Sequence, residues 1–296
     1  MHVAENLASP GDYGLAYRRG TPHSDGTIAW DTAFQTVLNA STKCGDISLA
    51  IDVSGYAWVG YGQYLVTNGQ ALVIKNAAND GTWSTASGFP TSVLIGSGTT
   101  FAYPILSPLN DDTVQAMTYE WDTDEISVSW IVAANGTVTS DGSATAQAVQ
   151  STGNAASVYV SRIESVSRAG EVHVAYLQSG TSNIRYNKRS TGGAWGAEAT
   201  IATGHADASV TSPRISFDDS QNVIVTWSNA SSEIWAVASH DDGSTWGAPI
   251  KLQTSPTLET SFEHMMPALM SDGAGNLQTT YLTSGYSLVH ALLGPL

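Results

Sequence analysis

The segment Ser239–Trp246, with the sequence SHDDGSTW, brings hydroxyl, carboxylate and indole groups together in one short stretch. Two kinds of chemistry are open to it. Asp241 could serve as a general acid or base. Alternatively, its carboxylate could cap the backbone N–H groups of a tight turn, with Gly243 at positive φ and Trp246 packed under the hairpin. We favour the turn and keep catalysis by Asp241 as the alternative.

Other patterns typical of reactive sites are missing from the sequence. The seven histidines show no His-x-His or His-Glu-x-x-His spacing, and Cys44 is the only cysteine, so a disulfide within the chain or a cysteine-based zinc site is excluded. The acidic turns do not complete a calcium loop, and neither a phosphate-binding loop nor Gly-x-Ser-x-Gly is present. The sequence therefore predicts no metal and no cofactor.

The turn segment recurs along the chain in degenerate form. The copies are DGTI, DGTW, NGTV, GGAW and GSTW, ending at residues 28, 83, 138, 195 and 246. The spacing of about 50–57 residues is typical of a repeat architecture. The complete segment is thus one part of a repeated structural unit.

A second series of short apolar runs has the same period. Each run follows a Gly, Asp or Asn turn and ends in an aromatic residue, at Tyr61, Tyr119, Tyr176, Trp227 and Tyr281. One repeat therefore consists of four strands, which we place for the first complete copy at residues 47–51, 57–61, 71–75 and 92–95. Four antiparallel strands per repeat predict an all-β fold and the blades of a β-propeller.

The complete segment resembles the Asp-box, or BNR repeat, of sialidase-like propellers at Ser239, Asp241, Gly243, Thr245 and Trp246. The other copies keep only the Gly-Thr-aromatic half or less. The resemblance implies that each hairpin joins the third and fourth strands of a blade on the outer edge, away from the ligand face.

The two ends of the chain interrupt the repeat. Residues 1–6 align with the second-strand segment 172–177, and the last segment stops before any fourth strand. We predict one domain over residues 1–296 with six blades, five being the second choice, and with incomplete terminal blades. One terminus could complete the sheet of the other, or another chain could supply the missing strands.

The charge balance limits the possible partners. Eleven Lys and Arg against 26 Asp and Glu give a formal charge of −15, which disfavours binding to nucleic acid or anionic membranes. No window is apolar enough for a membrane span, and no signal peptide is recognisable. The abundance of Gly, Ser, Thr, Tyr and Trp fits an exposed protein, outside the cell or on a virion surface.

The resemblance also indicates where catalytic residues would lie. Sialidases use an arginine cluster for the substrate carboxylate, a Tyr nucleophile paired with a Glu, and an Asp acid or base. Arg162 and Arg214 occupy equivalent positions in neighbouring repeats, but no third arginine matches them. Tyr119 and Glu120 are adjacent on a strand, so their side chains point to opposite faces. These four residues are the candidates for an enzyme.

Aromatic residues beyond those that the repeat requires are candidates for sugar binding, through stacking on the apolar face of a sugar ring. The alternative is that they fill the space between blades. They are Trp58, Tyr64, Trp121, Trp130 and Trp235.

The sequence thus favours a non-enzymatic, exterior binding or structural propeller that contacts glycans or a neighbouring subunit, with a virus or phage particle component as one form of it. A diverged sialidase-like glycoside hydrolase is the alternative, and the fold alone does not separate the two.

Overall fold

The computed structural model is all-β in the part of the chain that it describes. It forms antiparallel sheets in two compact units, Met1–Val149 and Gln150–Leu296. Within the described part, no helix is long and apolar enough to cross a bilayer. The described residues are 1–9, 12–25, 27–40, 44–63, 70–93, 102–120, 125–141, 163–178, 181–204, 206, 213–218, 220–229, 231, 233–254, 268–271, 277–282 and 288–292.

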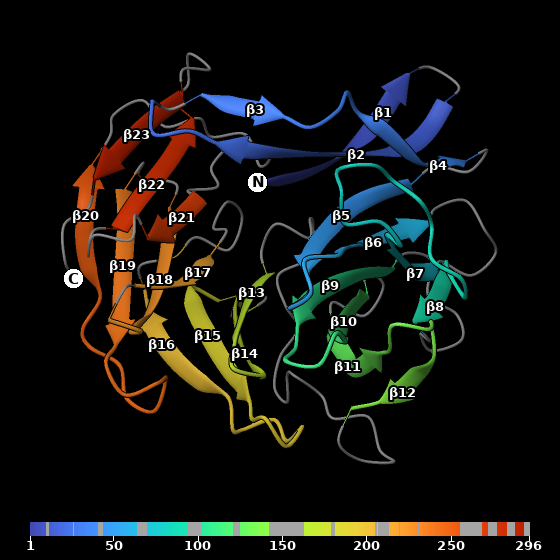
Figure 1. Ribbon diagram of the computed structural model, residues 1–296. Helices are drawn as coiled ribbons and strands as arrows, with labels where there is room; N and C mark the ends of the chain where they lie inside the picture. Colours follow the sequence, from blue (N-terminus) through green and yellow to red (C-terminus); the bar gives the residue numbers. More distant parts are fainter. Residues whose placement is uncertain are drawn as a thin grey trace. The chain divides into compact units, whose positions relative to one another are not determined.

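The first unit holds three four-stranded sheets that follow one another along the chain, blue to green in Figure 1. In the first sheet, the long strand β2 pairs with β1 on one side and with both β3 and β4 on the other. The strands of the three sheets are β1 (His2–Ser9), β2 (Asp12–Pro22), β3 (Ile28–Trp30) and β4 (Gln35–Ala40); β5 (Cys44–Ile51), β6 (Ala57–Gln63), β7 (Gln70–Lys75) and β8 (Thr91–Val93); β9 (Ala102–Pro108), β10 (Val114–Glu120), β11 (Glu125–Val132) and β12 (Val138–Ser140).

The second unit holds two four-stranded sheets and, in its described part, one three-stranded sheet, yellow to red in Figure 1. In each, the strands pair in chain order. They are β13 (Ile163–Arg168), β14 (Glu171–Leu177), β15 (Asn183–Arg189) and β16 (Ala199–Thr203); β17 (Arg214–Phe217), β18 (Val223–Ser228), β19 (Glu233–Ser239) and β20 (Ile250–Thr254); β21 (Ala268–Ser271), β22 (Leu277–Leu282) and β23 (Leu288–Leu292).

The predicted all-β class and the four-stranded antiparallel sheets are confirmed. The strands β5, β6 and β7 cover the first three segments expected for the first complete repeat, and β8 includes residues 92 and 93 of the fourth, whose last two residues lie outside the described part. Successive sheets joined in this way are consistent with propeller-like blades. The number of blades, the closure of a ring and the single domain over 1–296 stay predictions.

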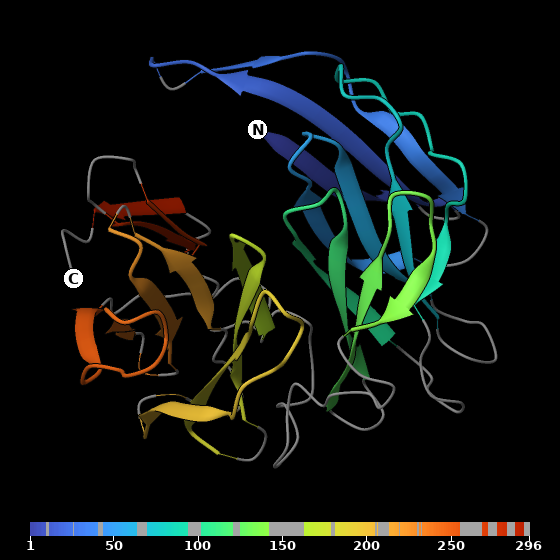
Figure 2. The same cartoon turned by 60° about the horizontal axis from the view of Figure 1, so that its bottom comes forward.

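The second strands β6, β14 and β18 of three sheets are buried almost throughout, on both faces. In unit 1, the Trp58 face of β6 packs on β9 and β10 through Leu106 and Ala116, and the opposite face packs on β2 through Val59 and Leu15. Figure 2 shows β5–β8 and β9–β12 side by side. Every residue of β18 is likewise buried. A strand covered on both faces consists almost entirely of apolar residues rather than alternating ones.

A buried ion pair holds the turn between β5 and β6. Asp52 Oδ2 accepts hydrogen bonds from Lys75 Nζ at 2.6 Å and from Trp58 Nε1 at 2.8 Å, while its Oδ1 accepts one from the backbone N–H of Tyr56 at 2.8 Å. The Lys75 ammonium also lies 4.2 Å from the Trp58 ring centroid. The side chains of Asp52 and Lys75 are 0% and 9% exposed, so each charge depends on the other.

We expect Asp52→Ala to lower the free energy of unfolding by about 3–5 kcal/mol, because it leaves the Lys75 ammonium buried without a counter-charge. Adding Lys75→Met should recover part of this loss, since the orphaned charge is then removed. Urea denaturation measures both variants, with Asp25→Ala at an exposed turn as the control, expected to cost under about 1 kcal/mol. If the single and double variants lost equal free energy of unfolding, the stabilisation by Asp52 would not come from its pairing with Lys75.

Candidate functional site

In the turn between β19 and β20, the polar side chains make hydrogen bonds within the turn. Asp241 Oδ1 accepts hydrogen bonds from the Thr245 backbone N–H at 2.7 Å and from Ser239 Oγ at 2.9 Å, and its Oδ2 accepts one from Thr245 Oγ1 at 2.6 Å. Ser239 Oγ in turn accepts the Gly243 N–H at 2.8 Å. The bonds from Thr245 and Ser239 lower the pKa of Asp241 to about 2. The carboxylate caps its own turn.

Three of the four degenerate copies keep a similar cap on the threonine, with a different capping residue. Asp25 and Asp80 each accept hydrogen bonds from the backbone N–H and the hydroxyl of the threonine two residues later. Asn135 accepts the backbone N–H of the threonine two residues later at 3.0 Å. In the sequence, these three residues align with Gly243 rather than with Asp241. The turns thus share a capped threonine, while the position of the capping side chain changes.

Gly243 and Trp246 fasten this turn to the neighbouring sheet of unit 2. Gly243 has a φ of 86°, and a Cβ atom added there would lie 2.0 Å from the Tyr186 hydroxyl on β15. The Trp246 and Tyr186 rings meet edge to face with centroids 4.8 Å apart, and Trp246 Nε1 donates to the Gly243 carbonyl at 3.2 Å. The turn is therefore a packing element between sheets.

Trp235, one of the predicted sugar-binding aromatics, lies at the other end of β19 among polar groups. Its indole Nε1 donates to Glu233 Oε2 at 3.0 Å, and the same oxygen accepts Asn229 Nδ2 at 2.9 Å. Lys251, the β20 residue in register with Trp235, donates to Glu233 Oε1 at 3.2 Å. The ring is half-buried against the core, and the Lys251 side chain is 46% exposed. We define Trp235, Glu233, Asn229 and Lys251 as the Trp235 site.

Glu233 organises this site. Hydrogen bonds from Asn229, Trp235 and Lys251 lower the pKa of its carboxyl below the ordinary value of 4.5. Such a charged acceptor beside an aromatic ring and an ammonium is suited to hydrogen bonding with the hydroxyls of a polar, ring-shaped ligand.

Arg214, a candidate for a substrate clamp, lies beside Glu164. Its Nη1 is 3.6 Å from Glu164 Oε1, and Glu164 Oε2 accepts the Ile215 backbone N–H at 2.8 Å. Burial raises the pKa of Glu164, opposed by the charge of Arg214 and the bond from Ile215. This ion pair therefore links β13 to β17. Arg162, the partner expected for a clamp, lies outside the described residues.

The remaining candidates divide into buried and undescribed ones. Trp58 is fully buried, so it fills the space between sheets and offers no surface to a sugar. Trp130 is half-buried against the core formed by β5–β8 and β9–β12. Tyr119 and Glu120 end β10, with Tyr119 in register with Tyr103, and their side chains are outside the described part of the structure. Tyr64 and Trp121 are also outside it.

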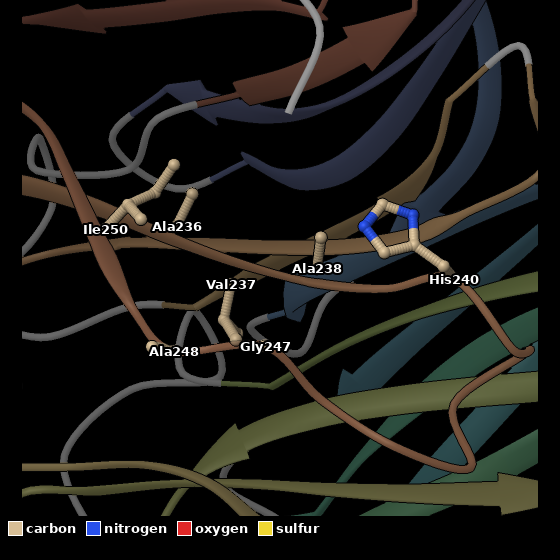
Figure 3. Close-up of a pocket in the computed structure, with 7 residues that line it drawn as sticks. All are labelled: Ala236, Val237, Ala238, His240, Gly247, Ala248 and Ile250. Atoms are coloured by element: carbon tan, nitrogen blue, oxygen red, sulfur yellow. The ribbon is translucent and has the colours of Figure 1, made fainter.

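A small pocket lies beside β19, lined by residues of this strand, of the turn that follows it and of the first position of β20. Its volume is about 160 Å³, below the roughly 300–1,000 Å³ usual for ligand pockets. Figure 3 shows the methyl groups of Ala236 and Ala238 in line with the His240 ring at its end. His240 is the sole polar side chain among the pocket residues, which are Ala236, Val237, Ala238, His240, Gly247, Ala248 and Ile250.

Three residues of the Trp235 site were missed by the sequence analysis. Glu233 precedes Trp235 by two positions on the same strand and therefore shares its face, which is a signal that alternation could have supplied. Lys251 reaches the site because β20 pairs with β19, and Asn229 reaches it from the loop before β19. No local sequence pattern marks either residue.

No protein-family model matches this chain, and no curated protein does. Solved structures do match it. The chain is similar to the Hadza microbial sialidase Hz136, with 12% identity and a TM-score of 0.59, covering 97% of this chain and 61% of the sialidase chain. It is similar to the BP39L lectin from Burkholderia pseudomallei, with 9% identity, a TM-score of 0.58 and coverage of 100% and 83%.

A third match is a point mutant of the Aleuria aurantia lectin in complex with alpha-methyl-L-fucoside, with 15% identity, a TM-score of 0.53 and coverage of 98% and 90%. At such identities the likeness concerns the fold. It groups this chain with a sialidase and with lectins, in agreement with propeller-like blades.

Gly243→Ala should destabilise the protein by about 2–4 kcal/mol, from backbone strain at positive φ and from the clash with Tyr186. Gly204→Ala is the matched control, because Gly204 has a φ of 78° and a Cβ there would meet nothing within 4 Å. Urea denaturation of both variants separates strain from packing. Equal losses would contradict the contact between the turn and Tyr186.

Proposed function

We propose that this protein binds glycans without hydrolysing them, and that the Trp235 site contacts the sugar. The observation that carries this proposal is the convergence of an indole, a carboxylate, an amide and an ammonium at one end of β19. The Trp235 ring would stack on a sugar face, while Glu233 and Lys251 would bond its hydroxyls. The fold likeness to lectins, one of them solved with a fucoside, supports the same class of ligand.

A glycoside hydrolase of sialidase type is the second candidate. The observation in its favour is the pairing of Arg214 with Glu164, whose raised pKa suits a general acid. We infer the binding function instead, because Arg214 is already engaged with Glu164 as a link between two strands. Turnover of a fluorogenic sialoside that Arg214→Ala abolishes would establish the enzyme.

We further propose that the protein acts on an exterior surface as a six-bladed propeller. The acidic charge and the abundance of small polar and aromatic residues support exposure to the outside. Antibody labelling of intact cells, and of purified virus or phage particles, tests this location. A neighbouring subunit as partner is tested by the mass of the purified protein in light scattering.

Trp235→Ala should weaken glycan binding at least about tenfold, the loss of ~1.4 kcal/mol expected when a stacking ring is removed. Trp235→Phe should keep most of the affinity, since a flat ring remains and only the N–H donor to Glu233 is lost. A glycan array with fucosides and sialosides, followed by titration of the selected glycan, measures this. Phe34→Ala, which removes an exposed aromatic of the other unit, is the control. An equal loss in Phe34→Ala, or none in Trp235→Ala, would place the site elsewhere.

Glycan binding should persist as the pH falls through the ordinary carboxyl value of 4.5, and decline only at lower pH. The reason is the lowered pKa of Glu233, which keeps this carboxylate charged over that range. In Glu233→Gln, binding should be weaker and independent of pH in the same interval. Surface plasmon resonance at stepped pH measures it, with circular dichroism as a check on folding. Loss of binding already above pH 4.5 in a folded protein would contradict the role of Glu233.

A further inference from the structure

A second group of charged residues lies in unit 2, away from the Trp235 site. Three adjacent strands of one sheet contribute Arg168, Glu171, His173 and Lys188 to a common face, since Arg168 is in register with Glu171 and His173 with Lys188. Asp242, from the turn after β19, meets this face from the next sheet. Its Oδ1 lies 2.5 Å from Arg168 Nη2, and its Oδ2 accepts a hydrogen bond from Lys188.

His173 is the unusual member of this group. Its side chain is fully buried, and its Nδ1 is hydrogen bonded to the Tyr186 hydroxyl at 2.7 Å. The Phe217 ring meets it edge to face at 5.1 Å. Its Nε2 has no hydrogen-bond partner and points to Asp242 Oδ1 at 3.6 Å. A buried ring nitrogen without a partner is costly, so an occupant for this position is expected.

Lys188 already places a positive charge in the middle of the group. Its ammonium lies 2.9 Å from Glu171 Oε1 and bonds Asp242 as well. Ligand atoms of Glu171, His173 and Asp242 all lie within 4.8 Å of one another. One imidazole nitrogen with two carboxylate oxygens is a donor set for Zn²⁺ and similar ions, whereas Ca²⁺ and Mg²⁺ prefer oxygen alone.

We propose that Glu171, His173 and Asp242 form a binding site for a divalent transition metal ion, in which the Lys188 ammonium occupies the place of the ion in its absence. Tyr186 would act as the outer partner that orients the imidazole, leaving Nε2 for the metal. The ion would enter past Glu171, Lys188 and Asp242, whose side chains are 25%, 26% and 36% exposed. Because Asp242 belongs to the next sheet, the metal would lock the Ser239–Trp246 turn to β14.

Titration of the whole protein with Zn²⁺ by calorimetry tests the site. His173→Gln should weaken the tightest binding event about tenfold or more. His240→Gln, which changes an exposed histidine of the hairpin that carries Asp242, should leave it unchanged. Lys188→Gln should bind Zn²⁺ about tenfold more tightly, because the competing ammonium is gone and both carboxylates remain. Co²⁺ bound to the wild type should give an absorption spectrum that His173→Gln lacks.

The gain in Lys188→Gln, with circular dichroism showing that this variant is folded, keeps the test decisive if His173→Gln is unstable. Binding that is the same in the wild type, His173→Gln and Lys188→Gln would overturn the proposal, as would the absence of binding in both the wild type and Lys188→Gln. Glycan binding is measured separately and does not depend on this outcome.

Discussion

The burial of both faces of the strands β6, β14 and β18 is the constraint on which the rest of the described structure depends. In β6, Trp58 faces one neighbouring sheet and Val59 faces the other, and both side chains are fully buried. A sheet built in this way cannot cover its own apolar surface, so each repeat needs others beside it. The sequence period of about 50–57 residues expresses that need, since each repeat supplies one sheet to the stack.

Aspartate side chains recur at the turns between these strands. Asp52 and Asp218 each accept the backbone N–H four residues later at 2.8 Å, in equivalent turns of the two units. Asp241 caps its turn through the Thr245 N–H in the same way. A tight turn leaves N–H groups that the ladder does not satisfy, and a carboxylate supplies the acceptor. This explains why aspartate recurs at the turns.

The Trp235 site and the group around His173 use the two ends of one strand pair. At its start, near Glu233, β19 carries polar side chains, whereas beyond Ser239, its last residue, the chain turns back against β15. The first end gathers hydrogen-bonding groups around the Trp235 indole, and the second joins two sheets through Asp242. A shared scaffold thus carries different chemistry at its two ends, and the fold by itself does not determine either.

The sequence by itself determined the repeat, the strand segments and the capped turns, because these depend on alternation, turn residues and neighbours close along the chain. It could not decide between Trp58, which is buried, and Trp235, which is half-buried beside Glu233, since both stand in similar strands. Nor could it bring Asp242 to Arg168, 74 positions away. Such contacts depend on which faces of two sheets meet, and that is settled only when the sheets pack, because no local pattern encodes a partner in another repeat.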